Sequence, residues 1–215
     1  MLRRITLYAL TFSPLAVVMI VAAPQPIAQA QQPRAGFFIT SAGTGRGGDL
    51  GGLSGADQHC TALAKQAGLP TRQWRAYLST TGANGMNARD RIGNGPWHNV
   101  KGQLIAQSVS DLHSEKAAIN NDTALDERGQ TINGEGRPNR HDILTGSTVE
   151  GRATEMTCAN WTSSGAGSAT VGHHDRLAFG TPGSPWNSAH ASRGCSQSDL
   201  VGSGGAGLIY CFAAD

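Results

Sequence analysis

Histidines and carboxylates gather in the C-terminal third of the chain, where they could bind a metal ion. His173-His174-Asp175 is a continuous run, His141-Asp142 lies upstream of it and His190 lies downstream. Imidazole nitrogens and carboxylate oxygens are donors that zinc accepts in proteins. Adjacent histidines in a strand point to opposite faces, so at most one of His173 and His174 would serve a given site. The alternative is that these are loop histidines that form surface hydrogen bonds.

Motifs of catalysis are missing from the sequence. It contains no G-x-S-x-G elbow, no H-E-x-x-H and no P-loop. The G-x-G-x-x-G at Gly43, Gly45 and Gly48 is not set in a βαβ unit, and a chance match is expected with 29 glycines. The run Asn87–Arg91 holds one carboxylate between two arginines without a partner base, which is typical of a solvated turn. We therefore predict a protein that is not an enzyme, with a zinc-dependent hydrolase built on the histidines as the weaker alternative.

Short strands and one clear helix would position these residues. Phe37–Ser41 and Trp74–Thr80 have strand character. Between them, Ser54–Asp57 matches a capping box, and apolar residues follow at helical spacing up to a stop at Gly68. This spacing places Cys60 on the buried side of the helix.

The rest of the chain is polar and turn-rich, with small hairpins predicted at 100–105 and 125–132. Further short strands are predicted at 142–145, at 158–162 and in the tail. In the tail Leu208, Tyr210 and Phe212 alternate with Ile209, Cys211 and Ala213. These patterns predict one α+β domain over residues 37–215, loop-rich, with short, mostly antiparallel strands and one or two helices.

The first thirty residues are typical of a secretory signal peptide. Arg3 and Arg4 precede an apolar run over 7–23, and Ala28-Gln29-Ala30 fits a cleavage site. A retained membrane anchor is the alternative. Residues 31–36 are expected to form a short flexible leader. The protein would then be secreted or periplasmic, without a membrane span after cleavage.

Charge and cysteine content limit the partners. Of 17 Lys and Arg residues, Arg3 and Arg4 lie in the predicted signal peptide, which leaves 15 against 15 Asp and Glu. A neutral domain argues against a nucleic-acid partner and against electrostatic membrane binding. Four cysteines without a Cys-x-x-Cys pair are expected to form disulfides in an oxidising compartment. Three pairings are open from the spacing alone.

The cysteine positions and the segments around them carry a family resemblance that spans about Phe37 to Phe212. The segments that carry it are Gly55–Cys60, Trp74–Ser79, Ile143–Ser147, Gly151-Arg152, Cys158–Trp161, Ser168–Thr170, Cys195 and Ile209–Cys211. They resemble the C-type lectin-like superfamily, and within it endostatin, the C-terminal module of certain collagens. The chain is also similar to short exported bacterial proteins described simply as lectins. The resemblance implies a C-type lectin-like fold with two nested disulfides, Cys60–Cys211 and Cys158–Cys195.

Sugar-binding members of this superfamily often use calcium, held by Glu-Pro-Asn or Gln-Pro-Asp and by Trp-Asn-Asp. Here Arg137-Pro138-Asn139 and Trp186-Asn187-Ser188 lie on the expected sides of Cys158. Calcium prefers several carboxylate and carbonyl oxygens, and Arg137 and Ser188 replace two acidic ligands. Endostatin's zinc ligands lie near its N-terminus, and the Phe37 region has no histidines to match them.

Trp186 and Asn187 could still bind a sugar without metal, since an indole stacks on sugar C–H groups and an amide pairs with hydroxyls. Alternatively, Trp186 packs over the Cys158–Cys195 bridge and Asn187 caps a loop. We expect an exported lectin-like protein that binds a glycan or extracellular polymer through loops between 137 and 192, with no cofactor required and calcium as the alternative. The alternative from the resemblance is an endostatin-like adhesion module that binds a protein and no sugar. The candidate ligand-binding residues are Arg137, Asn139, Asp142, Trp186, Asn187 and His190, and the candidate metal ligands are His173, His174 and Asp175.

Overall fold

The computed structural model describes residues 34–133, 138–175 and 185–215 of the 215-residue chain. The predicted signal peptide, residues 1–30, lies outside the described residues, as does the start of the predicted leader. Across the described ranges, no helix is both long and apolar enough to span a bilayer. The described chain is a mixture of helices and antiparallel sheet, with two disulfides.

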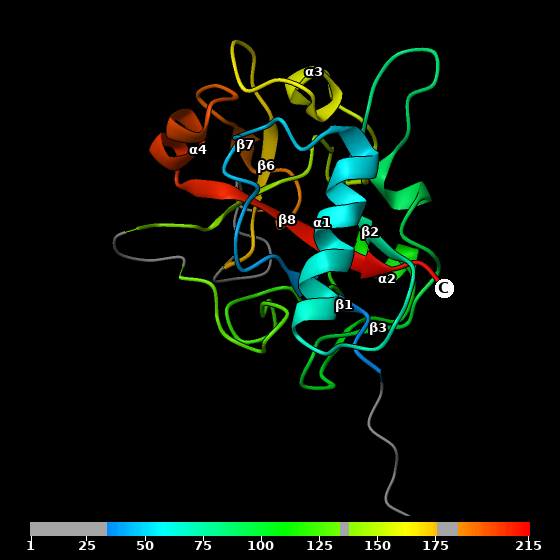
Figure 1. Ribbon diagram of the computed structural model, residues 1–215. Helices are drawn as coiled ribbons and strands as arrows, with labels where there is room; N and C mark the ends of the chain where they lie inside the picture. The colour runs from blue at the N-terminus through cyan, green and yellow to red at the C-terminus, as the bar shows by residue number, and fades with distance from the viewer. Residues whose placement is uncertain (1–33, 134–137, 176–184) are drawn as a thin grey trace, which may run out of the picture. The chain divides into compact units, whose positions relative to one another are not determined.

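The last strand, β8 (Gly205–Ala213), organises the main sheet (Figure 1). β1 (Phe37–Ile39) and β2 (Trp74–Ala76) both pair antiparallel with its C-terminal half, so they lie along its opposite edges. β5 (Asp142–Leu144) pairs with its N-terminal half and is the one parallel neighbour among the described strands. β6 (Thr170–His173) and β7 (His190–Ala191) extend the sheet beyond β5. A separate hairpin joins β3 (Trp97–His98) to β4 (Leu104–Ala106).

Both faces of β8 are buried, and Leu208 to Ala213 form the unbroken apolar run that is typical of such a strand. Ile209, Cys211 and Ala213 lie in one apolar cluster with α1, and Leu208, Tyr210 and Phe212 lie in a second cluster. The 99–103 turn between β3 and β4 confirms the predicted hairpin near 100–105, and a bridge between Leu125 and Thr131 confirms the second. Because each face of β8 belongs to one of the two apolar clusters, the C-terminal strand lies at the centre of the apolar core.

α1 (Gly52–Gln66) lies across β8 in Figure 1 and buries Cys60 completely, as its spacing predicts. The predicted capping box is wrong, because the helix begins at Gly52 and places Ser54 and Asp57 inside it. Asp57 has another role. Its carboxylate accepts from the Ala76 backbone N–H at 2.9 Å and pairs with Arg75 and Arg91 at 2.6 and 2.8 Å.

Three shorter helices bring the described total to four, more than the one or two predicted. They are α2 (Val109–Leu112), α3 (Cys158–Trp161) and α4 (Gln197–Ser203), and a 3-10 turn covers Ala88–Asp90. α4 was not anticipated. Its N-terminus has a capping box in which the Ser196 hydroxyl accepts from the Asp199 backbone N–H at 3.1 Å.

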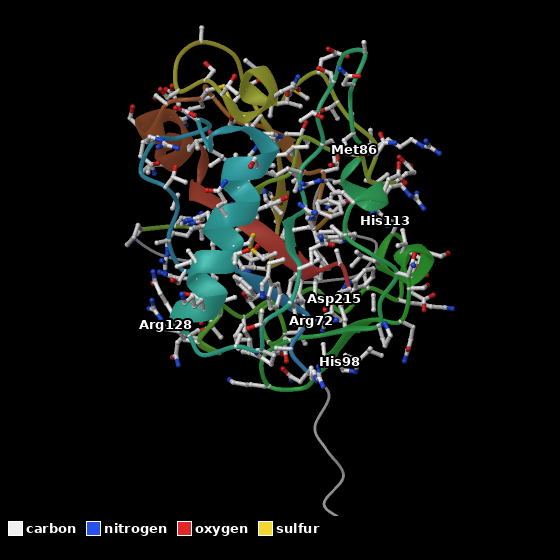
Figure 2. All side chains as sticks on the ribbon, turned by 45° about the vertical axis from the view of Figure 1, so that its right-hand side comes forward. Arg72, Met86, His98, His113, Arg128 and Asp215 are labelled. Carbon is white, nitrogen blue, oxygen red and sulfur yellow. A yellow bond between two sulfur atoms is a disulfide. The ribbon has the colours of Figure 1, made fainter. Side chains whose placement is uncertain are left out.

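The disulfides pair as the resemblance implies, Cys60 with Cys211 and Cys158 with Cys195. The first ties α1 to β8 and encloses 151 residues, whereas the second encloses 37. An ion pair of 3.0 Å between Arg72 and Asp215, neighbours in Figure 2, fastens the C-terminal residue to the segment before β2.

The strand predicted over 158–162 is wrong, because Cys158–Trp161 forms a left-handed turn. All four residues have positive φ, between 47° and 67°. Several contacts outweigh the steric cost that a Cβ meets in this region. Trp161 Nε1 donates to Ser79 O at 2.8 Å, Thr81 N donates to Asn160 Oδ1 at 2.9 Å, and the Cys158–Cys195 bridge fixes the start.

Replacing Ala159 by glycine is expected to stabilise the protein by about 1 kcal/mol. Ala159 has φ 52°, where its Cβ costs energy that glycine avoids, and the side chain is exposed, so little packing is lost. Urea unfolding followed by tryptophan fluorescence measures the change. The matched control is Ala62→Gly inside α1, where glycine should destabilise by a similar amount. A loss of stability at both positions would contradict the assignment of strain to this turn.

Candidate functional site

Strand register brings three of the predicted residues to one place on the sheet. In the β5–β6 pair Asp142 lies directly opposite His173, and in the β6–β7 pair His190 lies opposite Val171. Because strand residues two apart share a face, Asp142, His173 and His190 project on the same side. His141 directly precedes β5, and its ring stacks on that of His173 with centroids 4.2 Å apart.

The three imidazoles converge on a single oxygen, Asp142 Oδ1. The Nε2 atoms of His141, His173 and His190 lie 3.2, 3.1 and 3.5 Å from it. The Nε2 atoms of His173 and His190 are 3.0 Å apart. We call His141, Asp142, His173 and His190 the β5–β7 cluster.

The β5–β7 cluster runs from the protein interior to solvent. The Asp142 side chain is 2 % exposed, whereas the side chains of His173, His141 and His190 are 14, 24 and 41 % exposed. Although three imidazoles are near, neither Asp142 oxygen accepts a hydrogen bond of acceptable geometry from the described residues. The ring N–H directions therefore do not line up with the carboxylate.

Charge in the cluster is strongly coupled. The neighbouring carboxylates of Asp142 and Asp175 raise the pKa of His141 to about 9, against a smaller opposing effect of burial. Burial opposes ionisation of Asp142, but His141 and His173 outweigh it and hold its pKa below the usual range. His141 therefore keeps its proton to a higher pH than an isolated imidazole does.

Of the other two candidate metal ligands, Asp175 contacts a histidine of the cluster and His174 does not take part in it. Asp175 Oδ2 accepts from His141 Nδ1 at 3.2 Å, so it orients that ring from behind. His174 is buried, and burial lowers its pKa to about 4, which keeps it neutral. As alternation predicts, His173 joins the cluster and its neighbour His174 does not.

Arg137 and Asn139, the candidate ligand-binding residues on either side of Pro138, differ in what the structure describes. Arg137 lies outside the described residues. Asn139 lies beside the cluster, where its Oδ1 accepts from the backbone N–H of His141 at 3.0 Å and fixes the turn into β5.

Trp186 and Asn187 are buried, which removes the stacking surface that the sequence offered. Trp186 is 3 % exposed and packs against Tyr77 and Tyr210, in the cluster remote from the Cys158–Cys195 bridge. The Asn187 amide donates to Thr148 O and Val149 O at 3.1 Å each, so it holds a loop, as the structural alternative predicts. Neither side chain can meet a sugar in this conformation.

The residues present do not fit the calcium that the resemblance implies. Calcium takes six to eight oxygen ligands. The β5–β7 cluster offers three imidazoles and one carboxylate, and Asp175 is engaged by His141. Nitrogen donors of this kind suit zinc-class ions instead. One ligand atom each from His141, Asp142 and His173 lies within 4.8 Å of the others, a spacing that a metal ion could bridge.

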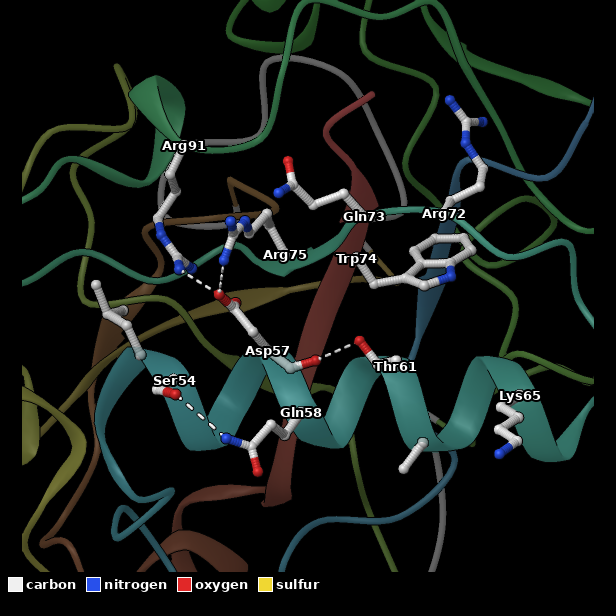
Figure 3. A pocket seen from close by; sticks show the side chains of 12 residues that line it. Ser54, Asp57, Gln58, Thr61, Lys65, Arg72, Gln73, Trp74, Arg75 and Arg91 are labelled. Carbon is white, nitrogen blue, oxygen red and sulfur yellow. Dashed lines mark hydrogen bonds and ion pairs between the residues drawn. The ribbon is translucent and has the colours of Figure 1, made fainter.

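A hollow of about 620 Å³ lies between α1 and the start of β2 (Figure 3). Its charges largely neutralise one another, because Asp57 is paired with both Arg75 and Arg91. Arg72 is engaged by Asp215. The β5–β7 cluster is the better candidate site, because the buried Asp142 carboxylate at its centre has no hydrogen-bond partner among the described residues.

A search of protein-family models finds no match to this chain, and a search of curated proteins finds no relative. The assignment of a function therefore depends on the geometry of the site.

Proposed function

We propose that this protein is an exported lectin-like binding protein that recognises a glycan or extracellular polymer at the β5–β7 cluster. The observation that carries the proposal is the convergence of four polar side chains from three neighbouring strands, partly open to solvent. They fall within the 137–192 segment in which we expect the ligand-binding loops. Imidazoles and a carboxylate offer the donors and acceptors that hydroxyl-rich ligands need.

Export is supported by the two disulfides, which are compatible with an oxidising, extracellular compartment. Both cross-links join segments distant in sequence. A loop-rich domain that must keep its loops in position outside the cell benefits from such links.

A protein partner is the second candidate, and one observation favours it. Every tryptophan, tyrosine and phenylalanine in the described part of the chain is buried, so that part offers no stacking platform for a sugar ring. An endostatin-like adhesion module would not need one. A hydrolase is the weaker candidate, because the sequence contains no G-x-S-x-G elbow, no H-E-x-x-H and no P-loop.

A glycan array with oxidised protein tests the proposal. Wild type is expected to bind a subset of glycans, and His190→Ala is expected to lose at least tenfold in affinity, because a donor of the cluster is removed. The matched control is Gln58→Ala in the hollow beside α1, which should bind as wild type does.

A blank array together with capture of a protein partner, insensitive to free sugars, would favour the adhesion module. Glycan binding that is lost in Gln58→Ala and kept in His190→Ala would move the site to the hollow.

A further inference from the structure

The β5–β7 cluster is arranged as a set of metal ligands rather than as a hydrogen-bond network. We propose that Nε2 of His141, His173 and His190 and Oδ1 of Asp142 bind one zinc ion. A role of this ion in holding ligand hydroxyls rests on the function proposed above. The presence of the ion does not, since it follows from the four donors alone.

The outward-facing ring nitrogens support this assignment. His141 Nδ1 lies 3.2 Å from Asp175 Oδ2, and His190 Nδ1 lies 3.0 Å from the carbonyl oxygen of Ala191. A carboxylate and a carbonyl can only accept, so in both rings Nδ1 carries a proton. In the neutral ring Nε2 then presents a lone pair to the centre of the cluster. A carboxylate or carbonyl behind the imidazole is the usual partner of a metal-binding histidine.

Positive charge, either a proton on an imidazole or a metal ion, is required at the centre of the cluster. Neutral His141 and His190 direct lone pairs into the space that holds the Asp142 carboxylate, at 3.2 and 3.5 Å. Lone pairs facing a buried carboxylate repel unless positive charge lies between them. Both Asp142 oxygens lack a hydrogen bond from the described residues, although the side chain is almost fully buried. A metal ion would satisfy all of these atoms at once.

The distances between donors agree with a tetrahedral zinc site. Zinc–ligand distances of 2.0–2.1 Å place neighbouring corners of a tetrahedron about 3.3 Å apart. Four of the six separations between these donors are close to this value, at 3.0, 3.1, 3.2 and 3.5 Å. The ligand atoms of His141 and His173 lie within 4.8 Å of each other. Calcium and magnesium prefer oxygen ligands, so a site with three imidazole nitrogens argues against both ions.

The ligands differ in how firmly they are held. Asp142 and His173 lie in β5 and β6, next to the sheet core, and His141 directly precedes β5. His190 comes from the two-residue strand β7, has the most exposed side chain and lies furthest from Asp142 Oδ1. His190 is thus the ligand whose release could open a coordination position to an external hydroxyl or carboxylate.

Titration of the EDTA-treated, oxidised protein with zinc chloride tests the site. Calorimetry and elemental analysis are expected to give one zinc per chain, and cobalt in place of zinc should give the strong visible absorption of a tetrahedral complex. His190→Ala should weaken zinc binding at least tenfold, and His173→Ala more. His98→Ala, labelled in Figure 2 and outside the cluster, is the matched control and should leave binding unchanged.

Absence of stoichiometric zinc, or equal zinc affinity in His190→Ala and wild type, would overturn the assignment. Circular dichroism checks that each variant is folded, and the exposed position of His190 makes that variant the safest. One zinc per chain together with a blank glycan array would sustain the metal site and refute the glycan function.

Discussion

Replacing Cys60 and Cys211 together by alanine is expected to lower the free energy of unfolding by roughly 5 kcal/mol. The bridge closes a loop of 151 residues, and in the chain-entropy model a loop of that length restricts the unfolded chain by about this amount. Small domains are stable by about 5–15 kcal/mol in total, so the variant should be close to unfolded at room temperature. Urea unfolding monitored by the buried tryptophans measures the loss.

The Cys158→Ala, Cys195→Ala pair is the matched control. Its 37-residue loop predicts a smaller loss of about 4 kcal/mol. Release of the left-handed turn at Cys158–Trp161 should reduce that loss further, since the turn no longer has to be held. An equal or larger loss in the control would show that loop length does not decide the contribution of each bridge.

Local patterns predicted the parts of the fold that depend on neighbours in sequence. The buried position of Cys60 follows from helical spacing, and the strand character of β8 follows from alternation over six residues. The mistakes came where distant contacts decide. Asp57 has the spacing of a cap residue, but it forms ion pairs with Arg75 and Arg91 instead. The turn that begins at Cys158 is held by hydrogen bonds to Ser79 and Thr81.

The site shows the same division. Alternation correctly separated His173 from His174, because that rule needs only two adjacent residues. The convergence of His190 on Asp142 depends on the register of β7 against β6 and of β6 against β5, which no short pattern contains. Trp186 looked like a sugar platform because of its neighbours in sequence. Its burial follows from Tyr77 and Tyr210, which are far from it along the chain.

Asp142→Asn is expected to reduce zinc affinity more than 100-fold while the protein remains folded. The amide keeps the shape of the side chain but lacks the negative charge that balances the ion. Loss of an outer-shell partner alone typically costs 10–100-fold, and Asp142 is a direct ligand in our assignment. The two disulfides and the unchanged shape of the side chain should maintain the fold.

The same variant separates metal binding from structural stability. Zinc at 100 times its Kd should raise the free energy of unfolding of wild type by about 2.7 kcal/mol, because it binds only the folded chain. Asp142→Asn should show almost no such increase at the same zinc concentration. Asp175→Asn, which removes only the partner of His141 Nδ1, should be intermediate, with a 10–100-fold loss of affinity. If Asp142→Asn were stabilised by zinc as strongly as wild type, Asp142 would not be a ligand, and the histidines alone would hold the ion.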